Sequence, residues 1–592
     1  MSSRASNSSV PNLQLSLPFQ ILSGIVSRLP IIPPSARSRG QHDSKGEWVY
    51  FLDCPRFRTS RTPDGAGGYV PVELVVPMDV LVCALIYGVY QYLTRQHIKQ
   101  FPLPPGPPAE LLLGHLRIAP QQDAERTYFR WSKEYKSNLI HIKVLGQHII
   151  VIHDLPTAIE LLEKRGSIYS DRPFFAYFDM FGWYENLTTM GYSHPSFSLL
   201  RREYQNYFAK GAERRMYDLQ TNEAHKLVKR IVESPEKWRS LLELFTTSII
   251  IRIVTGHEIK DLDDEYVSIA SDVSHTLKAG GPPGATGVDI CPLLRYLPCC
   301  FDPTGTTAYI RKMRYAIKNL YNVPYNHVQK ELAAGTAPPS FLRSLIDDQQ
   351  AESNSGTGSG LTKEQITGLG GTAFAAGADT SEALDTLTTF IFAIVNHPDV
   401  QEKARAELDA VVGPNRLPEM EDRKNLPYVE RIVQETFRFW PAVPLGVPHK
   451  SMEDDVYDDM FIPKGSLLLF NAFAMGHEET IYSDPWKFNP DRYMPHEEGG
   501  RGEPLPVGHF GFGRRICPGR LVGEATVFIA IATMLHVLVL KRTRNEKGGE
   551  IIVDPETAKY TTGLTSHPET VLCDIEPASE RAKQLATEAY TD

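Results

Sequence analysis

The sequence predicts a mainly helical fold with a smaller β portion, an α+β protein with one long central helix. Helical hydrophobic patterns dominate between residues 200 and 440, and short strands, helices and turns follow them. Thr362-Lys-Glu-Gln365 is a capping-box pattern that starts a helix, and this helix can run to Asn396, just before Pro398. At about 1.5 Å per residue it would be about 50 Å long and would cross the whole domain.

Shorter elements follow from local patterns. The run Leu139-Ile-His-Ile-Lys-Val-Leu-Gly-Gln-His-Ile-Ile-Val-Ile152 predicts a β-hairpin that turns near Gly146 and Gln147. Residues 158–165 predict a helix with one apolar face. Residues 353–360 contain only Ser, Asn, Gly and Thr, so we expect a flexible surface loop there.

Composition excludes several classes of protein. Of 592 residues, 42% are hydrophobic and 22% charged, and the net charge is −9 with both signs spread along the chain. Nucleic-acid-binding proteins usually show a basic patch, so we expect no nucleic-acid partner. The seven cysteines include no Cys-x-x-Cys pair, which favours neither a disulfide framework nor a zinc site.

A membrane anchor is predicted near the N-terminus. Leu74–Leu93 carries a single charge, Asp79, and a helix of this length spans about 30 Å, the thickness of a hydrocarbon core. Arg95 and Lys99 follow, which places the next part of the chain in the cytosol. The alternative is a buried core helix. We expect residues 70–101 to form the anchor and its basic stop, and residues 102–592, which begin with a stiff proline-rich stretch, to form a single domain.

Residues 1–69 allow two interpretations. No acidic residue precedes Asp43, and several arginines lie among many serines, which is typical of a transit peptide and would target the protein to mitochondria through residues 1–42. The alternative is that translation begins at Met78, so that residues 1–69 are a disordered or wrongly assigned extension. We favour the second interpretation.

One loop carries the strongest chemical signal, a cysteine held among glycines and arginines. The run is Phe510-Gly-Phe-Gly513-Arg-Arg515-Ile-Cys517-Pro-Gly519. The glycines permit close backbone approach, the arginines supply positive charge, and a helix that starts after Pro518 would direct its positive end towards a thiolate. Five fixed residues at these positions match by chance with odds of about 1 in 5,000. A lone buried cysteine in a glycine-rich turn is therefore a poor alternative.

This loop resembles the haem-binding signature of the cytochrome P-450 superfamily, and the resemblance extends from Pro102 to Cys573. It implies the cytochrome P-450 fold, haem b (iron protoporphyrin IX) as cofactor and monooxygenase chemistry. Cys517 would be the axial iron ligand. The other cofactor-binding residues of the loop would be Phe510, Gly513, Arg515 and Gly519.

Ala376-Gly377-Ala-Asp379-Thr380-Ser381, inside the predicted long helix, resembles the oxygen-activation motif of this family. Gly377 would leave room for dioxygen, the Thr380 hydroxyl would relay a proton, and Asp379 would be the acid end of the relay. A simple small-residue contact between helices is the alternative.

Other residues match the family less specifically. Glu435 and Arg438 lie on one helix face, and with Arg492 they resemble a structural charge triad. His449 and Arg201 would contact haem propionates. At the position where family members usually carry a tryptophan, four residues before the arginine, this chain has Phe197, which lacks an N–H donor.

By the same resemblance, the substrate pocket draws on the loop from Phe174 to Thr189 and on the segment 443–447. The pocket residues that we single out are Ala373, Phe374, Val443, Leu445 and Leu564. Most of these side chains are apolar, so we expect a lipophilic substrate.

The function implied is insertion of one oxygen atom from O2 into a lipophilic small molecule. Because no flavin or nicotinamide fingerprint is visible, electrons should come from a separate NADPH–cytochrome reductase, with cytochrome b5 as a second candidate donor. The chain would be a single-pass protein of the endoplasmic reticulum membrane with a cytosolic haem-thiolate catalytic domain.

The stretch Glu163–Pro173 resembles fungal enzymes of secondary metabolism, of the O-methylsterigmatocystin oxidoreductase-like group. This favours a terpenoid, polyketide or aromatic substrate. Detoxification of a xenobiotic is an alternative with the same chemistry. A redox-neutral haem-thiolate isomerase or dehydratase and a non-catalytic haem sensor are further alternatives, and Asp379 and Thr380 argue against both.

Overall fold

A computed structural model of the chain describes residues 39–42, 48–51, 100–183, 185–280, 286–290, 292–296, 305–355, 360–378 and 382–588. The chain divides into two compact units, residues 1–85 and 86–592. In the first unit, β1 (Arg39–His42) and β2 (Trp48–Phe51) form an antiparallel pair. The predicted anchor at Leu74–Leu93 lies outside the described residues, as does most of the stretch 1–69.

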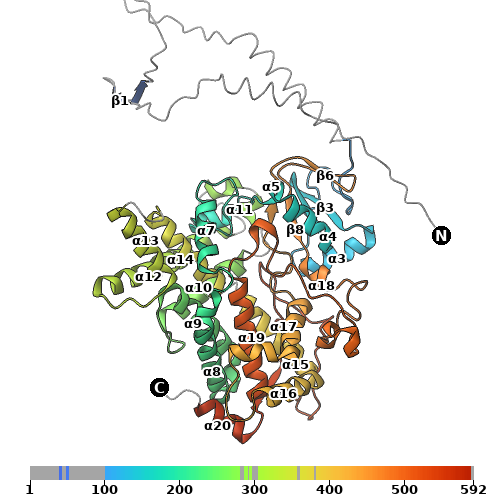
Figure 1. The fold of residues 1–592 in the computed structure, drawn as a ribbon. Helices are drawn as coiled ribbons and strands as arrows, with labels where there is room; N and C mark the ends of the chain where they lie inside the picture. The colour runs from blue at the N-terminus through green and yellow to red at the C-terminus, as the bar shows by residue number, and fades with distance from the viewer. Residues whose placement is uncertain are drawn as a thin grey trace, which may run out of the picture. The chain divides into compact units, whose positions relative to one another are not determined.

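The second unit is mainly helical with small sheets, so the predicted fold class is confirmed (Figure 1). Its longer helices are α3 (Ala124–Tyr135), α7 (Phe197–Tyr207), α8 (Tyr217–Glu233), α9 (Trp238–Thr255), α10 (Glu265–Ala279), α12 (Thr306–Ala334), α13 (Phe341–Ser355), α14 (Lys363–Ala378), α15 (Glu382–Asn396), α16 (Pro398–Val411), α17 (Pro427–Phe439), α19 (Arg520–Val537) and α20 (Glu580–Glu588). Its shorter helices are α4 (Leu155–Ala158), the π-helix η1 (Ile159–Lys164), α5 (Gly166–Tyr169), α6 (Ala176–Phe181), α11 (Gly287–Ile290) and α18 (Ala472–Gly476).

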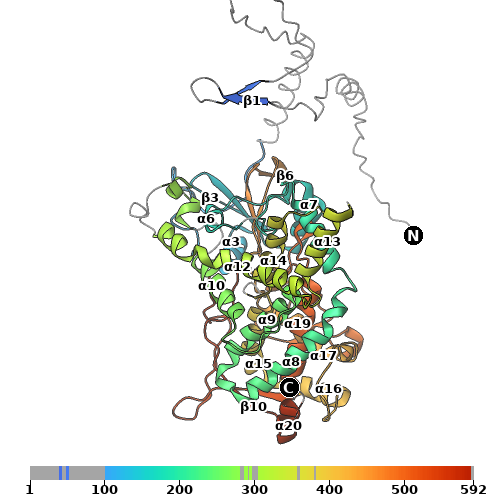
Figure 2. The same cartoon turned by 90° about the vertical axis from the view of Figure 1, so that its left-hand side faces the viewer.

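The centre of this unit is a layer of apolar helices around α19. Residues 525–538 of this segment are all buried, because their side chains are almost entirely apolar on every face of the helix. α19 packs against α8, α15 and α17, and α9 packs against α8 and α14 (Figure 2). Within the described residues, α19 is the one helix long and apolar enough to cross a membrane, and 78% of it is buried inside the protein.

The main sheet has four strands in the order β3-β4-β8-β5. These are β3 (Leu139–Val144), β4 (Gln147–Ile152), β8 (Leu467–Phe470) and β5 (His449–Lys450). β4 and β8 pair in parallel and the other pairs are antiparallel. The predicted hairpin is confirmed, with its turn at Leu145 and Gly146, both at positive φ. β6 (Asp455–Tyr457) pairs with β7 (Met460–Ile462), and β9 (Leu538–Arg542) pairs with β10 (Cys573–Pro577).

The predicted start of the central helix is confirmed. The Thr362 N–H donates to Gln365 Oε1 at 2.9 Å, and the Gln365 N–H donates to Thr362 Oγ1 at 3.2 Å, which is a reciprocal capping box. Helical structure continues as α14 and resumes as α15, but residues 379–381 lie outside the described part of the chain. The prediction of one unbroken helix to Asn396 therefore remains a prediction.

A buried charge network joins α17 to the segment before the cysteine loop. Glu435 accepts hydrogen bonds from Arg438 Nε at 2.8 Å and from Arg492 Nε at 3.0 Å. The Tyr493 hydroxyl donates to the same carboxylate at 2.8 Å, and Arg492 also pairs with Glu503. Neither Glu435 nor its two arginines has any exposed side-chain surface. Each buried charge is therefore matched by others within the protein.

Glu435→Gln should lower the free energy of unfolding by about 3–5 kcal/mol, because it leaves buried arginine charges without their partner. Urea-induced unfolding measures this change. Arg431→Gln is the matched control on the same helix, because its ion pair with the exposed Glu498 should contribute at most about 1 kcal/mol. Equal losses in the two variants would contradict the structural role of Glu435.

Candidate functional site

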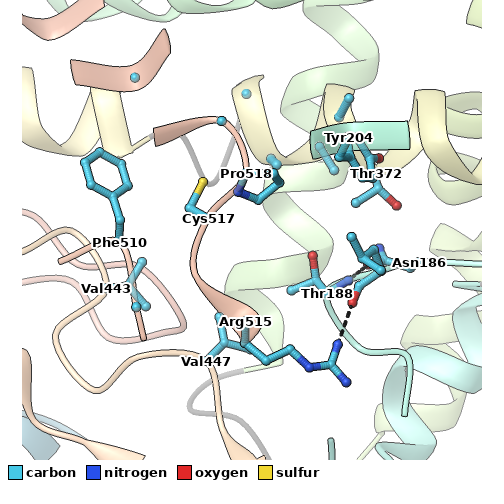
Figure 3. Close-up of a pocket in the computed structure, with 18 of the residues that line it drawn as sticks. Asn186, Thr188, Tyr204, Thr372, Val443, Val447, Phe510, Arg515, Cys517 and Pro518 are labelled. Carbon is cyan, nitrogen blue, oxygen red and sulfur yellow. Dashed lines mark hydrogen bonds between the residues drawn. The ribbon is translucent and has the colours of Figure 1, made fainter. Parts of the chain in front are cut away.

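A cavity of about 340 Å³ lies at the centre of the helical unit, which is within the usual size range of ligand pockets. Its walls come from α7, α9, α14, the start of α15, segment 443–449 and the loop that precedes α19. Figure 3 shows the Cys517 sulfur and Pro518 in the middle, with Phe510 and Val443 on one side and Thr372 and Asn186 on the other. Most of the lining side chains are apolar or small.

The loop from Phe510 to Gly519 places the Cys517 thiol in the cavity wall. The Cys517 N–H donates to the Phe510 carbonyl at 2.9 Å and closes the loop. Gly513 has φ +54°, and a Cβ there would lie 2.3 Å from the Leu162 carbonyl oxygen, so only glycine fits. α19 begins directly after Gly519, so the positive end of a helix lies close to the sulfur and favours an anion at this point.

Three arginines, Arg172, Arg201 and Arg515, line the same cavity. Arg172 donates to the carbonyls of Thr188, Val447 and Pro448. Arg515 donates to the carbonyls of Ser170, Leu187 and Met190, and Arg201 donates to the carbonyl of Ile516 at 2.6 Å. Backbone carbonyls orient these guanidinium groups but do not neutralise their charge.

The positive charges of Arg515 and Arg201 make it less favourable for the buried Arg172 to stay charged. Burial and the neighbouring Arg515 hold the pKa of Arg172 well below its usual range. Burial lowers the pKa of Arg515 to about 10, and Arg201 contributes to the lowering. Among the described residues none of the three pairs with a carboxylate within 4.0 Å, and the nearby Asp171 faces Lys450 Nζ at 3.9 Å instead. A bound anion would relieve this imbalance.

A haem fits the donors that surround the cavity. Cys517 supplies a sulfur ligand for iron, and three buried cations face a group that carries two propionates. The Arg201 Nε atom is buried and has no hydrogen-bond partner in the described part of the chain, so it can donate to an added anion. The residues present therefore match both the metal and the charge of this cofactor.

Phe197 and His449 also line the cavity, as the sequence predicted for this region. The Arg515 guanidinium lies 4.1 Å from the centre of the Phe197 ring, a cation–π contact. Phe197 thus positions an arginine even though it has no N–H to donate. His449 Nδ1 donates to the Tyr169 carbonyl at 2.8 Å, and burial together with Arg172 holds its pKa well below the usual value.

The predicted proton relay is only partly described. Asp379 and Thr380 lie outside the described residues, so their predicted role remains a prediction. Gly377 lines the cavity, and a Cβ there would lie 2.3 Å from Ile250 Cγ1. The glycine therefore allows α9 to approach α14 closely, in addition to the space for dioxygen that we predicted from the sequence.

Three of the five predicted pocket residues line the cavity, namely Ala373, Val443 and Leu564. The other two, Phe374 and Leu445, do not line this cavity. Phe374 is fully buried on another face of α14, with its ring 5.9 Å from that of Tyr266 on α10. Leu445 packs against the side chains beneath the main sheet instead of the cavity.

Sequence reasoning missed several lining residues. Arg172 lies in the stretch Ser170-Asp-Arg-Pro173, and nothing local marks it as a site residue. His509 immediately precedes Phe510, and its two ring nitrogens are buried without a partner in the described residues. Ile249, Ile250 and Ile253 of α9 also line the cavity. Apolar side chains lie on all sides of that helix, which was a signal that more than one of its faces is covered.

Comparison with known proteins identifies relatives over most of the chain. The Cytochrome P-450 family model matches residues 104–553. A cytochrome P-450 monooxygenase of Armillaria gallica is 35% identical over 494 residues, which cover 83% of this chain and 94% of that protein. Cytochrome P-450 monooxygenase 45 of Postia placenta is 35% identical over 88% of this chain and 97% of its own length. Cytochrome P-450 monooxygenase COX2 of Coprinopsis cinerea is 34% identical over 87% of this chain and 95% of its own length.

Arg172→Met should speed the loss of haem to apomyoglobin by about tenfold or more, because a hydrogen bond to a charged group contributes about 1.5–3 kcal/mol. Absorbance during transfer gives the rate. Arg514→Met is the control, since Arg514 lies in the same loop but contacts Tyr192 outside the cavity. Unchanged haem loss in Arg172→Met, or equal loss in the control, would contradict the assignment.

Proposed function

The chain belongs to the cytochrome P-450 family and is a monooxygenase that uses haem. On this basis we propose its substrate class, its cofactor-binding residues and its electron donor. The substrate is a lipophilic small molecule of fungal secondary metabolism, a terpenoid, a polyketide or an aromatic compound. One oxygen atom from O2 is inserted into it. The cofactor is haem b, and Cys517 would bind its iron.

The observation that carries this proposal is the pairing of one thiol with three buried arginines in an apolar cavity, none of which forms an ion pair with a carboxylate within the described residues. Cys517 sits at the positive end of α19, and Arg172, Arg201 and Arg515 line the same space. A thiolate, an iron porphyrin and two propionates would balance these charges better than a neutral ligand would. A neutral lipophile alone would leave the arginines uncompensated.

When bound, the haem supplies the redox chemistry that activates dioxygen. The chain's own residues position and protect it. Cys517 would supply electron density to the iron, and Arg172, Arg201 and Arg515 would hold the propionates. His449 would join them once a propionate beside it raises its pKa, so that Nε2 carries a proton and can donate. We assign proton delivery to Asp379 and Thr380, and Phe510, Gly513 and Gly519 would shape the loop that presents the thiolate.

The lining of the cavity supports a lipophilic substrate. Phe175, Phe178, Ile249 and Leu564 are among its apolar side chains, and they exclude water from the reacting centre. The relatives named above come from fungi, and the stretch Glu163–Pro173 resembles fungal enzymes of secondary metabolism. Together these features favour biosynthesis of a secondary metabolite over a broad detoxifying role.

The electron donor is a separate NADPH–cytochrome reductase in the same membrane, with cytochrome b5 as a second donor. We place the protein in the endoplasmic reticulum membrane, held by residues 70–101, with residues 102–592 as one cytosolic catalytic domain. The apolar stretch Leu74–Leu93 and the basic residues after it support this arrangement.

Cys517→Ala should abolish the haem-thiolate absorption of the reduced carbon monoxide complex, because no other sulfur faces the cavity among the described residues. The difference spectrum of the purified protein measures this. Cys573→Ala is the control, since Cys573 lies on β10 away from the cavity. A Cys517→Ala protein that retained the thiolate spectrum would overturn the assignment.

Thr380→Ala should retain haem but release hydrogen peroxide in place of product, because the proton relay is interrupted. The ratio of product to NADPH consumed measures the coupling. Thr388→Ala is the control, as the Thr388 hydroxyl donates to the Leu384 carbonyl within α15. An unchanged ratio in Thr380→Ala would exclude Thr380 from the relay.

A further inference from the structure

A buried ionic chain lies behind the cavity. His567 Nδ1 lies 2.7 Å from Asp385 Oδ1, and both side chains are almost fully buried. Arg239, on the exposed first turn of α9, donates to His567 Nε2. An arginine can only donate, so Nε2 is the acceptor and the ring proton is on Nδ1, where it points to Asp385. The imidazole therefore links a surface cation to a buried carboxylate.

No other described group neutralises this carboxylate. Asp385 Oδ2 is buried, and within the described residues it has no hydrogen-bond partner. Within the part of the chain that the structure describes, the negative charge of Asp385 is thus balanced through the imidazole and Arg239. Removal of either partner would leave a buried charge unmatched, so the orientation of His567 is strongly determined.

His567 forms the base of a short loop, residues 561–567, that reaches the cavity. The Thr561 N–H donates to the His567 carbonyl at 2.9 Å, and the His567 N–H donates to Thr561 Oγ1 at 3.1 Å. These two bonds close the loop, and Leu564 at its tip lines the cavity. Residues 561–565 are only half-buried, whereas Ser566 and His567 are buried. The position of the tip therefore depends on how the base is held.

The base is also attached to helices whose other residues line the same cavity. Asp385 follows Ala383 on α15, and Arg239 lies on α9 ahead of Ile250. Ser566 adds a third attachment, because its N–H donates to the Ala442 carbonyl at 2.8 Å, next to Val443. The loop tip is thus fixed relative to three walls of the cavity.

We propose that Asp385, His567 and Arg239 are positioning residues that hold the 561–567 loop, and through Leu564 they determine how well the cavity accepts long apolar ligands. They touch no reacting group. Their effect is on the distance between Leu564 and the opposite wall, where a ligand's apolar tail lies. This inference rests on the proposed function in one respect, because ligand binding is measured at the haem iron.

The test uses two probes on the full-length protein. Imidazole binds the iron and is too small to reach the loop, whereas 1-dodecylimidazole carries a long apolar tail. Arg239→Ala should raise the dissociation constant of 1-dodecylimidazole by about tenfold and leave that of imidazole within about twofold, since the lost contacts are apolar ones at the tail. Titration of the haem absorption band gives both constants.

Four further variants separate positioning from general damage. Arg239→Lys, which keeps a donor for His567, should restore most of the tail binding. In the double variant of Arg239→Ala and Leu564→Ala, the loss should be no larger than in Leu564→Ala alone, because both act through the same contact. Arg343→Ala is the matched control, a half-buried arginine at the start of α13 that pairs with Asp347. Additive losses, or equal losses for both probes, would refute the proposal.

A second readout does not depend on haem. Hydrogen–deuterium exchange of peptides covering residues 561–567 should be faster in Arg239→Ala and Asp385→Asn than in Arg343→Ala, because the bond from Thr561 to His567 opens more often. If the unchanged protein shows no absorption change with imidazole, the proposed haem site fails, and exchange alone decides the role of the ionic chain. Unchanged exchange in both Arg239→Ala and Asp385→Asn would exclude a role for the ionic chain in holding the 561–567 loop.

Discussion

The functional site depends on an excess of buried positive charge around one cavity. Arg172, Arg201 and Arg515 are oriented by backbone carbonyls, which fix their geometry but leave their charge in place. Buried cations are costly unless an anion accompanies them. A fold that gathers three of them beside a thiol is therefore suited to an anionic, metal-containing cofactor and poorly suited to an empty or purely apolar cavity.

The network around Glu435 shows the opposite arrangement in the same protein. There each buried arginine meets a carboxylate, and the phenol of Tyr493 completes the set. Such a network needs no ligand and can stabilise the haem-free chain. The difference between the two clusters separates a structural role from a binding role by charge balance alone, without reference to sequence motifs.

Much of the site could be predicted because its signals are local. The run from Phe510 to Gly519 encodes a tight loop and a helix start within ten consecutive positions, and the structure reproduces both features. Arg172 could not be predicted in the same way, since its place in the cavity depends on contacts with Val447 and Pro448, far away in the chain. Only the folded structure brings these segments together.

The errors have an equally physical origin. Ala373 and Phe374 are neighbours on α14, and a step of one residue turns a side chain by about 100°, so one faces the cavity and the other faces Tyr266. The sequence indicated which segment of the helix lines the pocket, but not which of its side chains point into the cavity. Phe197 was identified as a departure from the family pattern, and its contact with Arg515 became visible only in three dimensions.

We expect the Cys517 sulfur to be bound to the iron of a haem in this cavity. Resonance Raman spectra of the ferric protein, prepared with natural and with heavy-isotope cysteine sulfur, report on this bond. An iron–ligand band should move to lower frequency with the heavier sulfur. A band whose frequency does not change with the sulfur label, but shifts with nitrogen-labelled histidine, would contradict the assignment of Cys517 as the ligand. His509 would then be the first candidate for the ligand.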